Sequence, residues 1–120
     1  GCHEGLTTSL LVDRCGGAEL VVGVDRSQTA VLTARRRFPR LTFGVFDLLS
    51  EEPELLRRMM PGDHSPTIAF VDLGGDARLS LVLKGLMALN RLDTLTTVVV
   101  KNEALLRAKQ MQGRPIAAPS

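Results

Sequence analysis

Four polar residues follow apolar runs that are typical of buried strands, and all four come after a glycine-rich turn. They are Asp25 after residues 20–24, Asp47 after 41–46, Asp72 after 67–71 and Lys101 after 96–100. The carboxyl ends of parallel strands meet at one edge of a sheet, so we expect these side chains to share a rim. Carboxylates there can bind ribose hydroxyls, and a lysine beside a carboxylate can move a proton.

The glycine-rich turn is Gly1-Cys2-His3-Glu4-Gly5, directly before a predicted helix. Asp25 stands twenty positions after Gly5, at the end of the next predicted strand. βαβ units bind nucleosides with this order and spacing, because glycines let the backbone approach the ligand and the carboxylate accepts ribose hydroxyls. The alternative, in which Asp25 is only a turn residue at a strand end, is less favoured.

The composition is that of an ordinary globular domain. The chain has 120 residues, of which 44% are hydrophobic and 23% charged, and its formal net charge is +2. It therefore forms one domain at most, without a strong charge bias toward nucleic acid. Aromatic residues make up 3%, all of them Phe, which disfavours a platform for stacked bases. Cys2 and Cys15 are too few for a disulfide framework, and we expect no bound metal.

No apolar run is long enough for a membrane span, and no segment resembles a signal peptide. We therefore expect no membrane partner and an intracellular location, either cytoplasmic or organellar.

Helical and strand patterns alternate along the chain. Helices are predicted over residues 6–14, 78–90 and 103–111, and two more are predicted to begin after the cap residue Ser27 and after Ser50. These helices alternate with the four strands named above. Such alternation predicts an α/β fold, a Rossmann-like three-layer α/β/α domain with a mostly parallel sheet. We expect this partial domain to cover residues 1–112 and the Pro/Ala-rich tail 113–120 to be loose.

The apolar spacing also predicts which helix faces are buried. The predicted buried sets are Leu6, Leu10 and Leu11; Ala30, Val31 and Ala34; Leu55, Leu56, Met59 and Met60; and Leu79, Val82, Leu83, Leu86 and Met87. The strands are apolar without alternation, which predicts burial on both of their faces.

These features together resemble the class I S-adenosylmethionine-dependent methyltransferases over most of the chain. The family's first motif, G-x-G-x-G after an acidic strand end, is matched by Gly1, His3 and Gly5, with His3 replacing the middle glycine. The run Val22-Gly23-Val24-Asp25-Arg26-Ser27 is similar to the second motif, whose carboxylate binds both ribose hydroxyls of the cofactor. The resemblance implies S-adenosyl-L-methionine as the cofactor.

Asp47 stands where the family has an acidic residue on the adenine amino group, although it could equally be a turn residue that leads into a helix. The cofactor-binding set that the resemblance implies is Gly1, His3, Gly5, Asp25, Arg26 and Asp47.

The family's first motif begins on a strand, and that strand is missing before Gly1. We expect a sheet that lacks this first strand and the C-terminal strands of the family. The first strand normally lies in the centre of the sheet, so its loss would expose two unpaired edges and destabilise the isolated chain. We expect another protein segment or another subunit to complete the sheet.

The methyl acceptor is less well defined by the sequence. Asp72-Leu73-Gly74-Gly75 is not the Asn/Asp-Pro-Pro-Tyr/Phe motif of many amino methyltransferases. Asp72 and Lys101 are similar in placement to two members of the Lys-Asp-Lys-Glu tetrad of ribose 2′-O-methyltransferases. The resemblance thus implies Asp72 and Lys101 as catalytic residues and RNA as one candidate acceptor. The alternative for Asp72 is that it only caps the Gly74-Gly75 turn. The alternative for Lys101 is that it is a solvated lysine at a strand end.

Two other functions remain open at this point. His3 in the glycine turn and the lack of a recognisable acceptor motif leave room for a non-catalytic, methyltransferase-like scaffold domain of a larger assembly. A NAD-dependent oxidoreductase is less favoured, because Glu4 would repel the pyrophosphate. The cluster Arg35-Arg36-Arg37 with Arg40 could contact RNA phosphates, but a solvated helix end is the favoured interpretation.

Overall fold

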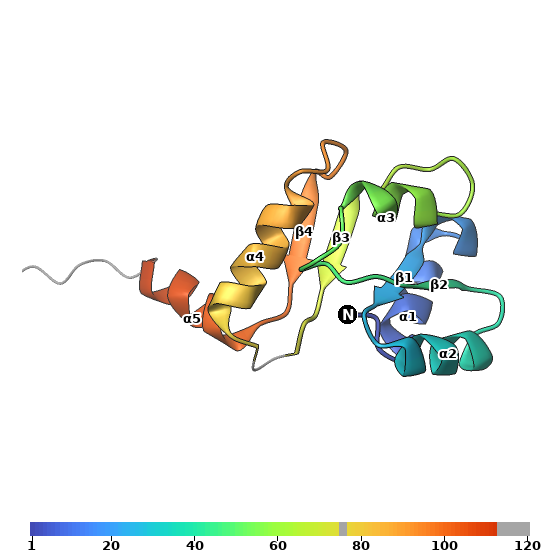
Figure 1. Cartoon of the computed structure of the whole chain (residues 1–120), viewed down its shortest axis with the longest axis horizontal. Coiled ribbons are helices and arrows are strands. Elements are labelled where there is room, and N and C mark those ends of the chain that lie inside the picture. The colour runs from blue at the N-terminus through green and yellow to red at the C-terminus, as the bar shows by residue number, and fades with distance from the viewer. Residues whose placement is uncertain (75–76, 113–120) are drawn as a thin grey trace, which may run out of the picture.

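The computed structural model describes residues 1–74 and 77–112. In chain order the elements are α1 (Leu6–Cys15), the 3₁₀ turn η1 (Ala18–Leu20), β1 (Val22–Asp25), α2 (Gln28–Arg37), β2 (Thr42–Val45), α3 (Glu54–Met59), β3 (Ile68–Val71), α4 (Leu79–Leu89), β4 (Thr97–Val100) and α5 (Glu103–Gln112) (Figure 1). Each predicted helix and strand is present, which confirms the alternating α/β class. The predicted turn at Gly75 and the tail 113–120 lie outside the described residues.

Local capping explains where the first two helices begin and end. The hydroxyl of Ser27 accepts a hydrogen bond from the Ala30 amide at 3.2 Å, so α2 begins at its predicted cap. α1 ends at Gly16, whose left-handed backbone (φ +91°) lets its amide donate to the Val12 carbonyl at 3.2 Å.

Strand pairing among the described residues is parallel, as predicted, but their strands form two separate pairs. β1 pairs with β2 from Val22↔Thr42 to Asp25↔Val45, and β3 pairs with β4 from Ile68↔Thr97 to Val71↔Val100. Within residues 1–74 and 77–112, no strand pairing joins β1 to β3. The arrangement fits a partial Rossmann-like sheet in which the place between β1 and β3 has no strand.

The β1–β2 pair is covered by helices on both faces. Phe43 of β2 packs against Val31 and Ala34 of α2 on one face. The methyl group of Met59 on α3 lies against Gly44 on the other face, since neighbouring residues of a strand point to opposite sides. The predicted three layers are confirmed for this half of the molecule.

The β3–β4 pair is covered on one face only. Val71 is buried there against Leu89 of α4. On the opposite face, Ile68 and Phe70 of β3 are 53% and 49% exposed, and Val99 of β4 is 46% exposed. The prediction that the strands are buried on both faces is therefore wrong for this pair, because none of the described helices covers that face.

The buried face of α4 agrees with the predicted one only in part. Val82 of the predicted stripe is buried, together with Gly85 and Leu89, whereas Leu83 and Met87 of that stripe are 44% and 72% exposed. The helix is apolar almost all the way round, so the spacing does not define one face. The α2 stripe, which has charged residues opposite it, is buried as predicted.

In α1 and α3 the predicted apolar faces are partly exposed. Leu6 and Leu10 of α1 are 59% and 57% exposed, and Leu55 of α3 is 37% exposed. The buried residue of α1 is Thr8, whose hydroxyl oxygen would lie 2.7 Å from a Cβ added to Gly23. The small residue faces the strand because helix and strand approach each other closely there.

Among the helices described, none combines the length and the apolar character needed to cross a membrane.

Candidate functional site

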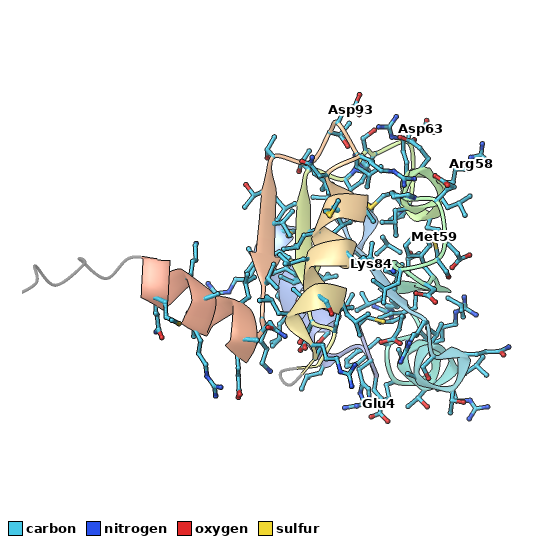
Figure 2. All side chains as sticks on the ribbon, turned by 60° about the vertical axis from the view of Figure 1, so that its left-hand side comes forward. Glu4, Arg58, Met59, Asp63, Lys84 and Asp93 are labelled. Carbon is cyan, nitrogen blue, oxygen red and sulfur yellow. The ribbon has the colours of Figure 1, made fainter. Side chains whose placement is uncertain are left out.

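The glycine turn lies where the carboxyl ends of β1 and β3 come together. The nitrogen of Gly1 donates to the carbonyl of Val24 at 2.9 Å, and a Cβ on Gly1 would collide with the carbonyl oxygen of Asp72. Figure 2 shows Glu4 of the turn at one end of the molecule and Asp93 at the opposite end. The structure therefore brings Gly1, Asp25 and Asp72 to a common rim.

The turn requires glycine at position 5 and a left-handed backbone at position 3. Gly5 has φ +91°, and a Cβ there would lie 2.7 Å from the Cζ atom of Phe43. His3 has a backbone φ of 50°, a value that residues other than glycine adopt rarely, although His adopts it more often than most. The residue that replaces the middle glycine of the motif thus keeps a conformation that glycine favours.

The Asp25 carboxylate is held by the backbone on both of its oxygens. Its Oδ2 accepts from the His3 amide and its Oδ1 from the Ser27 amide, each at 2.9 Å. Partial burial alone would raise the pKa of Asp25, but these two hydrogen bonds and the nearby amino terminus outweigh it and lower the pKa. The group is therefore an oriented, charged carboxylate beside the turn, and Arg26 next to it is exposed.

Asp72 and Lys101 are neighbours at the ends of β3 and β4. The Nζ of Lys101 lies 3.8 Å from the Oδ2 of Asp72, with the two side chains 80% and 46% exposed. The other carboxylate oxygen of Asp72 accepts from the Gly74 amide at 3.1 Å. Asp72 thus caps the turn, as the simpler interpretation has it, and it also faces the lysine.

Asp47 lies two positions beyond β2, and its contacts are those of a turn residue. Its Oδ1 accepts from the Leu49 amide at 3.0 Å, and its own amide donates to the Glu51 carboxylate at 2.6 Å. The segment that carries it leads toward α3, which agrees with the turn interpretation that the sequence left open.

Asn102 is a buried polar residue that the sequence reasoning missed. Its side-chain amide donates to the Ala77 carbonyl at 3.0 Å, and its Oδ1 accepts from the Leu105 amide at 2.9 Å. It caps α5 and ties the connection before α4 to the end of β4, beside Lys101. The sequence does carry a signal for a helix cap here, because Asn102 directly precedes the predicted helix start at Glu103.

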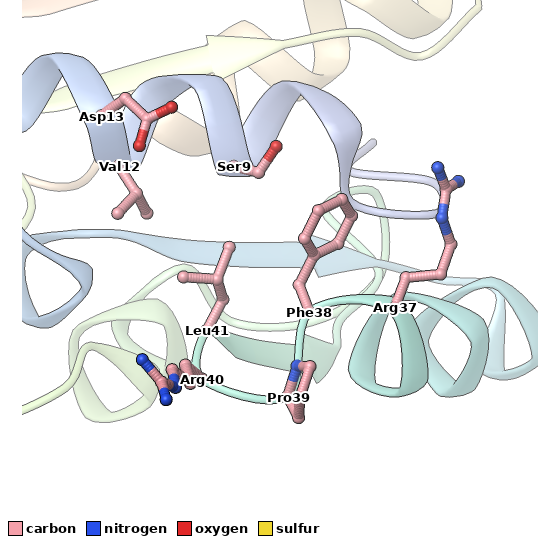
Figure 3. A pocket seen from close by; sticks show the side chains of 8 residues that line it. All are labelled: Ser9, Val12, Asp13, Arg37, Phe38, Pro39, Arg40 and Leu41. Carbon is pink, nitrogen blue, oxygen red and sulfur yellow. The ribbon is translucent and has the colours of Figure 1, made fainter.

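One pocket lies away from the rim, between α1 and the connection from α2 to β2. It has a volume of about 470 Å³. Figure 3 shows its lining, which is Ser9, Val12, Asp13, Arg37, Phe38, Pro39, Arg40 and Leu41. None of the predicted site residues lines it. Two members of the predicted arginine cluster do, and Arg37 also pairs with Glu4 at 3.2 Å.

Comparison with known proteins supports the same family as the motifs. The chain is 33% identical over 72 residues to a Delftia acidovorans protein described as trans-aconitate 2-methyltransferase. The similarity is a distant, partial match to one methyltransferase. The match covers 60% of this chain and 24% of that methyltransferase. No family model and no solved structure matches the chain.

Proposed function

We propose that this chain is the cofactor-binding part of an S-adenosylmethionine-dependent methyltransferase. The observation that carries the proposal is the Asp25 carboxylate, which two backbone amides hold at a strand end directly beside the glycine turn. A carboxylate so oriented is suited to bind the two hydroxyls of a ribose.

The residues at the rim fit such a cofactor. Each oxygen of a carboxylate can accept two hydrogen bonds, and each Asp25 oxygen accepts one from the protein backbone. The turn formed by Gly1, His3 and Gly5 would hold the cofactor beside Asp25, with Arg26 and Asp47 completing the set. Bound S-adenosylmethionine would supply a methyl group on a cationic sulfur, and carboxylates near the rim stabilise positive charge.

The acceptor proposed first is a small carboxylic acid. The relative is named for trans-aconitate, and the exposed ammonium group of Lys101 at the rim attracts an anionic acceptor. Because Lys101 lies beside Asp72, the pair would position the acceptor rather than bind the cofactor.

The second candidate acceptor is the ribose 2′-hydroxyl of RNA. The 3.8 Å separation of Lys101 and Asp72 favours it, since a lysine beside a carboxylate can assist removal of the hydroxyl proton. The same two residues would then act in proton transfer.

Calorimetric titration with S-adenosylmethionine, S-adenosylhomocysteine and NAD tests cofactor binding. We expect both adenosyl ligands to bind and Asp25→Asn to weaken them by roughly tenfold or more, since hydrogen bonds to a charged group contribute about 1.5–3 kcal/mol. Asp63→Asn, in the exposed loop after α3, is the matched control. Binding of NAD alone would favour an oxidoreductase, and binding of none of the three would favour the scaffold function.

Methyl transfer from labelled S-adenosylmethionine separates the acceptors. Transfer to trans-aconitate supports the small acid, and transfer to RNA supports the ribose hydroxyl. Lys101→Ala should reduce either reaction, whereas Lys84→Ala on the exposed side of α4 should not. Unchanged transfer by Lys101→Ala would exclude the assigned role.

A further inference from the structure

An ion pair joins the glycine turn to the end of α2. The Nη1 atom of Arg37 donates to the Oε2 atom of Glu4 at 3.2 Å, and the two residues are 33 positions apart in the chain. Figure 3 shows Arg37 at the end of α2, with its side chain pointing toward the segment before α1. The contact therefore links two elements that each also donate a backbone hydrogen bond to Asp25, one through His3 and the other through Ser27.

Glu4 is one of the two central residues of that turn. The amide of Gly5 donates to the carbonyl of Cys2 at 3.0 Å, which closes a four-residue turn. The other central residue is His3, which has a φ of 50° and donates its amide to the Asp25 carboxylate at 2.9 Å. A left-handed backbone at a residue with a side chain persists only where its surroundings hold it. Because the two central residues are neighbours, a rotation of the turn that moves Glu4 also moves the His3 amide.

The helix α2 contacts the site at both of its ends. Before its first turn, the amide of Ser27 donates to the Asp25 carboxylate at 2.9 Å. In its last turn, Arg37 pairs with Glu4. The helix is fixed on the sheet between these points, because Val31 is fully buried there. Ten residues of α-helix have a set length of about 15 Å, so α2 determines where the guanidinium group lies relative to the carboxylate.

Phe38, the residue after α2, holds both partners by packing. Its ring lies 3.1 Å from the position of a Cβ on Gly5, and the guanidinium carbon of Arg37 lies 5.5 Å from the centre of the ring. A stacked guanidinium group loses less side-chain freedom when it forms an ion pair. The side chains of Arg37 and Glu4 are 47% and 43% exposed, and pairs of this exposure stabilise a fold only weakly. Their expected effect is therefore on the orientation of the turn.

We propose that Glu4 and Arg37 are positioning residues of the cofactor site, whose ion pair holds the glycine turn in the orientation that directs the His3 amide onto Asp25. The inference rests on the proposed function in one respect, namely that the oriented carboxylate binds the ribose of the cofactor. Without the pair the turn rotates more freely, and one of the two hydrogen bonds that orient the carboxylate is weakened. Cofactor binding then includes the cost of ordering the turn, which lowers the affinity.

Two single variants and their combination test the pair. Glu4→Gln and Arg37→Gln remove the ion pair with little change in the shape of either side chain, and the double variant completes a mutant cycle. Arg36→Gln is the matched control, because Arg36 is exposed and lies beside Arg37 in the same last turn of α2. It removes the same charge from the same helix end without removing the contact to Glu4.

The first measurement is the pKa of the Asp25 carboxyl group, followed by carbon-13 NMR without any cofactor. Direct electrostatic effects have opposite signs, because losing the negative charge of Glu4 lowers this pKa and losing the positive charge of Arg37 raises it. Weakening of the His3 hydrogen bond to the carboxylate raises the pKa in both variants. The sign of the two shifts therefore separates positioning from simple charge effects.

We expect both single variants and the double variant to raise the pKa of Asp25 and to speed hydrogen exchange at the His3 amide by about threefold. Arg36→Gln should change neither. Shifts of opposite sign in Glu4→Gln and Arg37→Gln, or no shift in either, would overturn the proposal.

The second measurement is calorimetric titration with S-adenosylhomocysteine, which lacks the charge of the sulfonium group. We expect each single variant to weaken binding by about threefold and the double variant to weaken it no further, since the two residues act through one contact. Unchanged affinity, or losses that multiply in the double variant, would contradict the positioning role. If the wild type binds no adenosyl ligand, the proposed function fails, whereas the pKa of Asp25 still decides whether the pair positions the turn.

Discussion

Gly5 and Gly16 provide a matched pair for measuring how closely the glycine turn packs on the sheet. They flank α1 with almost the same backbone, φ 91° and ψ 4° at Gly5 and φ 91° and ψ 6° at Gly16. A Cβ on Gly16 meets nothing within 4 Å, whereas a Cβ on Gly5 lies 2.7 Å from Phe43 and 3.1 Å from Phe38. Substitution by alanine therefore imposes the same backbone cost at both sites and a steric cost at Gly5 alone.

The two costs can be separated in magnitude. The left-handed conformation costs a residue other than glycine about 1–2 kcal/mol. Carbon atoms pack at about 3.5–4.0 Å, and Phe43 is only 5% exposed, so the ring has little room to move. Overpacking of this kind adds about 1–3 kcal/mol. We expect Gly16→Ala to destabilise the fold by about 1 kcal/mol and Gly5→Ala by about 2–4 kcal/mol.

Urea unfolding followed by far-ultraviolet circular dichroism measures the difference, since the chain has no Trp or Tyr for fluorescence. With a slope of about 1–3 kcal/mol per molar urea, the midpoints of the two variants should differ by roughly 1 M. In a Phe43→Leu background the extra cost of Gly5→Ala should shrink, because the clashing ring atoms are gone. Equal destabilisation by Gly5→Ala and Gly16→Ala would refute the packing of the turn against Phe43.

Three further predictions concern the same unfolding measurement. The folded pKa of Asp25 is lowered below its unfolded value of about 3.9, so its stabilising contribution is complete above that value and is lost as the pH falls through the folded pKa. The urea midpoint should thus fall more steeply below about pH 4 in the wild type than in Asp25→Asn; parallel curves would contradict this. Val82→Ala should cost about 2 kcal/mol and Met87→Lys less than about 0.5 kcal/mol, and a larger cost for Met87→Lys would show that Met87 is buried, as the spacing predicted. Arg35→Lys should cost about 1 kcal/mol, because both Nε and Nη2 of Arg35 donate to the Phe43 carbonyl, at 3.2 and 2.8 Å; an unchanged midpoint would show that this fork is not stabilising.

The accuracy of the sequence predictions depends on whether a signal is local. Ser27 was predicted as a helix cap and is one, because the cap involves only its own next turn. The buried faces of α1 and α4 were predicted only in part. Val82 of the predicted α4 set is buried, but Met87 of that set and Leu10 of α1 are exposed, because packing against the neighbouring strands chooses the buried side. Asn102 was missed although its position before a helix start was visible in the sequence.

The same distinction between local and long-range signals applies to the residues of the candidate site. Asp25, Asp72 and Lys101 could be placed at strand ends because each follows an apolar run directly. The two backbone hydrogen bonds on Asp25 could not be predicted, since one comes from His3, in a turn that precedes α1. Asp47 shows the opposite case, in which a residue at a suitable position makes only local turn contacts.

The amino-acid order of this chain was sufficient to predict alternating helices and strands, parallel pairing and the carboxylates that follow the strands. Those features arise from hydrophobic periodicity and from the short connections of βαβ units, which act within about thirty residues. The tertiary structure places the expected unpaired edges on β1 and β3, and it alone shows that one face of β3 and β4 is exposed and that Gly1 contacts both strand ends. These facts depend on contacts between residues far apart in the chain, whose partners are chosen by packing and not by spacing.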